Sequence, residues 1–291
     1  MILSTFLAPL DFDIFTVANG QALINAKTML QLQPLIAYNH VRQLNLGVHV
    51  VVSMTDLVGI IASFPNLTHL CATMGDVHLG HSTTLSQLLQ PLRTSLQELV
   101  IHTGYMCSGR PLSPQLISSD FSTFPSLKKM SVPSSTWIQD WDCGAEGHRQ
   151  TIPRGFTWRL EDRRGLYTQL PPSIEDLEVS FAWPTAIFAS GYAYQEQYKH
   201  LPEVVRVKGY AWIEELLCTG VRRVALKEHS HECRWTQLHR YSNADMPTSL
   251  LHLPDSVARR FSTAGVELEI QVLDCVASYS RSRYTPGGWM S

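Results

Sequence analysis

Three histidines and one cysteine lie within a short polar stretch late in the sequence, and their side chains are able to bind a metal. His229, His231 and Cys233 alternate, so an extended backbone would place them on one side, and His239 could reach the same point from a loop. Imidazole and thiolate ligands suit zinc. The spacing matches no standard zinc module, so the alternative is a cluster without a chemical role. The leading expectation is therefore no cofactor, with zinc as the alternative.

Sequence motifs of the common enzyme classes are missing from the chain. It contains no Gly-x-Ser-x-Gly nucleophile turn, no Gly-x-x-x-x-Gly-Lys phosphate loop, no Gly-x-Gly-x-x-Gly dinucleotide motif and no His-Glu-x-x-His zinc motif. We therefore do not expect an enzyme, and catalysis at the cluster spanning 229–239 is kept as the alternative.

A short apolar pattern recurs along the chain and predicts the fold. It reads apolar, two residues, apolar, one residue, apolar, and a final segment from Val266 to Val272 keeps only the alternation. Such a unit cannot bury its apolar edge alone and must stack on its neighbours. The six full copies are Val41–Leu44–Leu46, Leu67–Leu70–Ala72, Leu96–Leu99–Ile101, Leu127–Met130–Val132, Ile174–Leu177–Val179 and Val221–Val224–Leu226.

Helix-period segments with polar starts and Gly or Pro ends lie between these motifs, as in Thr55–Pro65, Ser82–Leu92, Leu116–Phe124, Tyr210–Gly220 and Asp255–Gly265. Alternating strands and helices favour an α/β fold. The sequence predicts an irregular leucine-rich-repeat-like solenoid, with a curved parallel sheet on its concave side and helices on its convex side.

The interval between motifs lengthens from 26 residues between Leu44 and Leu70 to 47 residues between Met130 and Leu177. We therefore expect insertions near 134–169, 181–207 and 227–253 within a solenoid that spans 29–274. We also expect residues 1–28 to form an N-terminal segment and residues 275–291 to form a flexible tail. Insertions in solenoids lie on the rim, where partners often bind. The tryptophans of the first insertion are candidate anchors for a partner, or they fold back on the solenoid: Trp137, Trp141 and Trp158.

Charged residues recur at one position of the motif, between its apolar residues. On parallel strands this position faces the concave surface, away from the core. From Glu98 onward the signs alternate, which predicts either a ladder of ion pairs within the sheet or a stripe that binds a partner protein. The row is Gln43, His69, Glu98, Lys129, Asp176, Arg223 and Glu267. The next row is expected to be small and chemically plain: Asn45, Cys71, Val100, Ser131, Glu178, Ala225 and Glu269.

The overall composition indicates which classes of partner and which cellular compartment to expect. The formal net charge is −2 and no long basic run occurs, so nucleic acid is not expected as a partner. No stretch is long and apolar enough to span a bilayer, and the N-terminus does not read as a signal peptide. Six scattered cysteines form no disulfide framework. We expect a protein of the cytoplasm or nucleus that is not secreted and not bound to membranes.

Several segments resemble one known family. Phe64-Pro-Asn-Leu67, Phe124-Pro-Ser-Leu127, Leu170-Pro-Pro-Ser-Ile174 and the closing segment 261–272 are similar to the divergent leucine-rich domains of filamentous-fungal F-box-type proteins. The resemblance covers roughly residues 30–272 and implies a repeat-built recognition domain. A recognisable F-box ahead of the repeats is lacking, which leaves at most a degenerate ubiquitin-ligase adaptor.

These observations predict a non-catalytic protein–protein interaction module, a recognition or scaffold protein whose partner is another protein. The alternatives are the metal-binding protein or enzyme described above, or an accessory protein of a fungal biosynthetic pathway. The sequence leaves the oligomeric state open.

Overall fold

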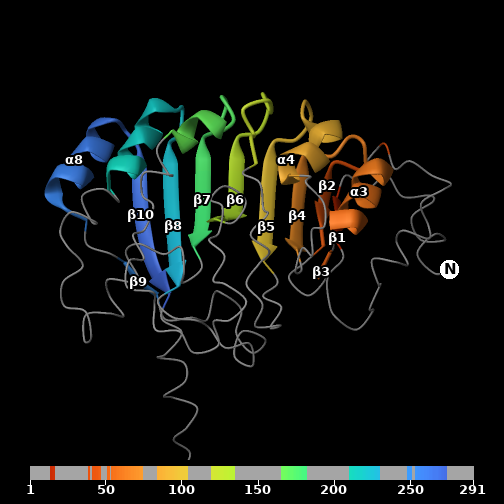
Figure 1. The fold of residues 1–291 in the computed structure, drawn as a ribbon, viewed down its shortest axis with the longest axis horizontal. Coiled ribbons are helices and arrows are strands. Elements are labelled where there is room, and N and C mark those ends of the chain that lie inside the picture. The colour runs from red at the N-terminus through yellow and green to blue at the C-terminus, as the bar shows by residue number, and fades with distance from the viewer. Residues whose placement is uncertain are drawn as a thin grey trace, which may run out of the picture.

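The strands follow one another almost in chain order across one sheet (Figure 1). A computed structural model describes residues 14–16, 39, 41–46, 51–52, 54–74, 84–103, 119–134, 165–181, 210–229, 248–250 and 253–273. The order across the sheet is β1-β2-β4-β5-β6-β7-β8-β10-β9, and β3 pairs with β4 outside this path. Neighbouring strands are parallel, except that β9 is antiparallel to β10. The protein therefore has an α/β fold with a mostly parallel sheet.

The strands are β1 (Ile14–Thr16), β2 (Gln43–Asn45), β3 (Val51–Val52), β4 (His69–Met74), β5 (Glu98–Thr103), β6 (Lys129–Pro133), β7 (Asp176–Phe181), β8 (Arg223–His229), β9 (Thr248–Leu250) and β10 (Glu267–Leu273). Seven of them, β2, β4, β5, β6, β7, β8 and β10, begin at the motif positions that the sequence predicts. The short strands β1, β3 and β9 were not predicted, and β9 lies inside the predicted insertion 227–253. The strand β8 continues to His229, so the first residues of that predicted range belong to a strand.

All eighteen apolar residues of the six full motifs are buried. Their side chains belong to one apolar core, together with residues of the helices such as Ile60, Trp212 and Phe261. Because side chains alternate along a strand, this core occupies one face of the sheet and the residues between the motif positions lie on the other face. The motif therefore sorts the sheet into an apolar face and a polar face.

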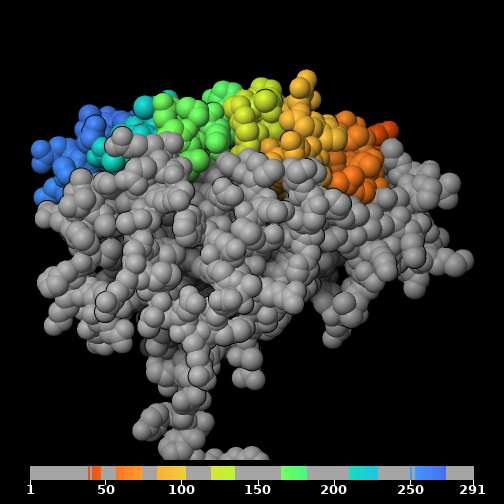
Figure 2. Space-filling view, in the orientation of Figure 1, coloured from red at the N-terminus to blue at the C-terminus, as the bar shows by residue number. Residues whose placement is uncertain are grey.

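The helices line the end of the sheet at which the strands begin (Figure 1). They are α3 (Met54–Ser63), α4 (Leu85–Leu88), α8 (Asp255–Thr263) and a helical segment at 210–215 that continues as the 3₁₀ helix Leu216–Cys218. Further 3₁₀ turns span Gln90–Leu92 and Leu166–Gln169. After α8, Gly265 adopts a positive φ of 70°, a conformation that glycine tolerates best and that turns the chain into β10. In the space-filling view the coloured residues run in chain order from α3 to α8 (Figure 2).

Two of the predicted helices differ in the structure. The helix predicted from Ser82 begins instead after Thr84, whose side chain and that of Gln87 form a reciprocal capping box, and it is short because Pro91 converts its second half to a 3₁₀ turn. The helix predicted for Leu116–Phe124 is wrong in its described part, since residues 119–127 form turns. There Phe121 and Phe124 are fully buried, with ring centroids 5.5 Å apart, and they fill the place of a helix face.

A hydrogen bond recurs between successive units. The polar residue before the first apolar residue of four motifs donates from its side chain to a backbone carbonyl of the preceding unit, at 2.8–2.9 Å. The donors and carbonyls are Asn66 to Asn39, Ser95 to Leu67, Ser126 to Thr94, and Ser173 to Leu127. These side chains satisfy backbone carbonyls and tie these four units to the units before them.

Candidate functional site

The polar face of the sheet brings together every charged residue of the predicted concave row. Each residue is the direct cross-strand partner of the next, from β2 to β10. We call this set the first polar row: Gln43, His69, Glu98, Lys129, Asp176, Arg223 and Glu267. The predicted register is therefore confirmed for the whole row.

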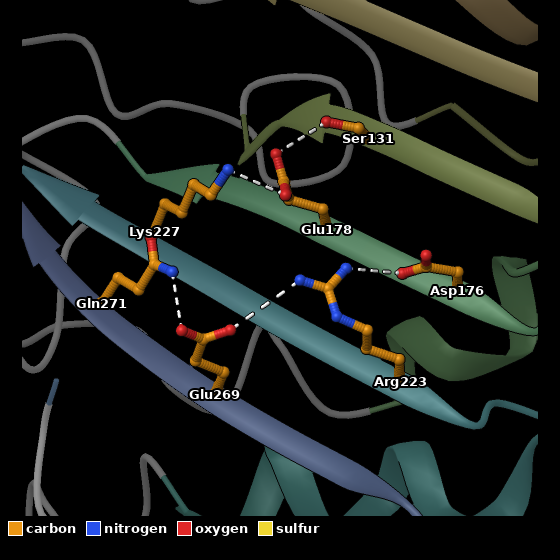
Figure 3. A network of polar contacts seen from close by, with 7 residues as sticks. All are labelled: Ser131, Asp176, Glu178, Arg223, Lys227, Glu269 and Gln271. Carbon is orange, nitrogen blue, oxygen red and sulfur yellow. Dashed lines mark hydrogen bonds and ion pairs between the residues drawn. The ribbon is translucent and has the colours of Figure 1, made fainter. Parts of the chain in front are cut away.

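Arg223 makes the best-formed contacts of the first polar row (Figure 3). Its Nη1 donates to Asp176 Oδ1 at 3.1 Å, and its Nη2 lies 3.8 Å from Glu269 Oε2. Partial burial acts to lower the pKa of Arg223, but the carboxylate of Asp176, followed by those of Glu178 and Glu267, raises it overall. Arg223 is thus a fixed cation among carboxylates.

Two other charged residues of the row are more exposed to solvent and make fewer ion pairs. Lys129 and Glu267 are exposed, whereas the other charged residues of the row are half-buried. Within the described part of the chain, no ion pair within 4.0 Å joins Lys129 to Glu98 or Asp176, although it faces both. The predicted ladder is therefore incomplete, and Lys129 and Glu267 remain available for contacts from outside the sheet.

The second row was expected to be plain, and this expectation is wrong. Glu178 Oε1 accepts a hydrogen bond from Ser131 Oγ at 3.0 Å, and Glu178 Oε2 pairs with Lys227 Nζ at 2.8 Å. Glu269 Oε1 accepts from Gln271 Nε2 at 2.7 Å (Figure 3). The second row therefore joins the first row to a third one.

Sequence reasoning missed this third row, which lies two residues beyond the second along each strand. It holds Thr73 and His102 on β4 and β5, and Ser180, Lys227 and Gln271 on β7, β8 and β10. The signal was present, because the same alternation extends past the last apolar residue of each motif. The polar face is therefore deeper along the strands than the motif alone indicates.

The Cys71 thiol of this face is not activated as a nucleophile. Burial, and then the charge of Glu98, raise the pKa of Cys71, so its thiol stays protonated at neutral pH. Ser131 donates to a carboxylate that is already paired with Lys227. The arrangement is suited to polar contact with another molecule and gives no support to nucleophilic catalysis.

A further ladder runs along the end at which the strands begin. Glu175 pairs with Lys128 at 3.2 Å and with Arg222 at 3.4 Å. The hydrogen bond and charge of Lys128 lower the pKa of Glu175. Both cations are well exposed, so these pairs contribute little to stability and mainly set the charge of this edge.

His102, on the polar face, makes the stability of the fold depend on pH. Its pKa lies below the ordinary value of 6.5, chiefly because burial disfavours the charged ring, with Glu178 opposing and Lys227 assisting the shift. The unfolded chain therefore binds a proton at pH values where the folded chain does not, so stability is lost as the pH falls below 6.5.

We expect the contribution of His102 to the free energy of unfolding to rise with pH up to about 6.5 and then to level off. Urea denaturation at a series of pH values measures this. The variant His102→Gln keeps a polar group but has no proton to bind in this range, so its rise should be shallower. Parallel curves for the two proteins would contradict the assigned environment of His102.

The remaining predicted site residues are placed only in part. His229 is the last residue of β8, and His231, Cys233 and His239 lie outside the described residues. Trp137, Trp141 and Trp158 also lie outside them, as do the predicted tail and most of the N-terminal segment. No group of three or more His, Cys, Asp or Glu side chains among the described residues is arranged to hold a metal. Cys71 and Cys218 are free thiols.

The helices in the described ranges are all too short or too polar to cross a membrane. Comparisons with protein-family models, with curated proteins and with solved structures found no match to this chain.

Proposed function

We propose that this protein is a non-catalytic interaction module that binds another protein through the polar face of its sheet. On this proposal the chain is an irregular leucine-rich-repeat-like solenoid whose helices cover the apolar face. The strand order and the repeated hydrogen bonds at Asn66, Ser95, Ser126 and Ser173 support the solenoid, since each unit contacts mainly its neighbours.

One observation carries the functional part of the proposal. Three in-register polar rows, rich in paired and unpaired charges, occupy the face of the sheet opposite the apolar core. Charged residues arranged this way contribute little to folding when half-exposed, but they set specificity and orientation in protein recognition. Lys129 and Glu267 are the charges most available to a partner.

The test is affinity capture from an extract of the source organism, with the tagged full-length chain and two charge-reversal variants. Lys129→Glu changes the polar face. Arg93→Glu makes the same charge change at an exposed residue beside the 3₁₀ turn Gln90–Leu92 and is the matched control. We expect specific partners, read by mass spectrometry, to be lost with Lys129→Glu and kept with Arg93→Glu. Equal capture by all three proteins would remove the polar face from the proposal.

A further inference from the structure

The charge order of the first polar row is self-complementary. Across β6, β7, β8 and β10 it reads Lys129, Asp176, Arg223, Glu267, so the signs run plus, minus, plus, minus. Read in reverse, the same row runs minus, plus, minus, plus. A second copy turned over onto the first would therefore meet an opposite charge at each of these four positions. Two-fold dimers use such a self-complementary patch, in which one residue contacts a second and the second contacts the first.

The geometry of this superposition is specific. A two-fold axis above the polar face, parallel to the strands and midway between β7 and β8, lays β6 of one copy over β10 of the other. Lys129 then faces Glu267 of the second copy, and Asp176 faces Arg223. An axis centred on a strand would bring like charges together, as in Lys129 over Arg223 around β7. Other axes between strands also match the alternation, but this one pairs the two exposed charges with each other.

The adjoining rows agree with the same axis. In the second row Ser131 faces Glu269, and Glu178 faces the small Ala225. Further along the strands, Ser180 faces Lys227. No pair of facing positions over β6, β7, β8 and β10 brings like charges together. The charge order of the first row does not by itself guarantee this for the other rows.

We propose that the polar face binds a second copy of this chain in a two-fold dimer in which Lys129 of each copy contacts Glu267 of the other. This inference rests on the proposed function, because it names the occupant of the same face. The contacts are charged and partly exposed, so the dimer should be weak and should dissociate as salt screens the charges. The oligomeric state should therefore depend on both concentration and ionic strength.

The test is a charge-swap mixture, followed by sedimentation equilibrium at low salt. In a dimer of the Lys129→Glu variant, the new glutamate of each copy faces Glu267 of the other copy. In a dimer of the Glu267→Lys variant, the new lysine of each copy faces Lys129 of the other copy. Each variant alone should dimerise at least about tenfold more weakly than wild type, because both symmetric contacts become repulsive. Mixed together, the two variants restore an attractive pair at both contacts, so the mixture should dimerise as the wild type does.

Three outcomes decide the matter. Recovery of dimers in the mixture supports the inference, and circular dichroism of each variant is the control for folding. A mixture that stays monomeric, from folded variants, overturns the pairing of 129 with 267. A monomeric wild type at low salt overturns the dimer altogether. In that last case the capture experiment still stands on its own, since a different partner can be lost with Lys129→Glu.

Discussion

Val179→Asp is expected to unfold the protein or to remove at least about 4 kcal/mol of its unfolding free energy, measured by urea denaturation. Val179 is fully buried at the centre of β7, on the apolar face. A carboxylate there would lose its hydration and find no partner among the apolar side chains of the core. The result would place this side of β7 against the core.

The matched control is the next residue of the same strand. Ser180 lies on the polar face, half-buried, and is the cross-strand partner of Lys227. Ser180→Asp introduces the same side chain beside a cation and should change stability by less than about 1 kcal/mol. Similar losses for both variants would contradict the division of the sheet into an apolar and a polar face.

Phe124→Ala is expected to cost about 3–5 kcal/mol, the usual range for removing a buried phenylalanine. The ring is fully buried beside Phe121, in the connection where a helix was predicted. Alanine would leave a cavity that this connection is poorly placed to close, because backbone hydrogen bonds from Phe124 to Phe121 and from Leu127 to Phe124 hold its turns.

Thr123→Ala serves as the control for Phe124→Ala. Thr123 lies in the same connection but is exposed, and it only accepts a hydrogen bond from Gln90. We expect a loss below about 0.5 kcal/mol, as for most surface substitutions. A loss under about 1 kcal/mol for Phe124→Ala would mean that the two phenylalanines do not replace a helix face in this unit.

The register of the strands was predictable because the apolar spacing fixes it. A one-residue slip of any strand would turn its buried leucines outward, so the motif determines which residues face each other across the whole row. This is why the row from Gln43 to Glu267 is found as predicted.

The contacts within that register were less predictable, since they depend on side-chain reach. Arg223 spans from Asp176 in its own row to Glu269 in the next one, which the alternation of signs does not reveal. The unit around Phe124 also differed, because serine and threonine between the two phenylalanines favour turns over a helix. The strand β9 was missed because three residues carry too short a pattern to be recognised.

The central claim is that the polar face contacts a protein, and carboxylate labelling of the captured complex tests it most directly. Carbodiimide coupling, read by mass spectrometry, reports the accessibility of each acidic side chain in the free monomer and in the complex. Glu267 and Glu98 report on the polar face. Asp255, in the first turn of α8, is the reference residue on a helix. We predict that labelling of Glu267 and Glu98 falls in the complex while that of Asp255 is unchanged. Unchanged labelling of both polar-face residues, or protection confined to Asp255, would contradict the account.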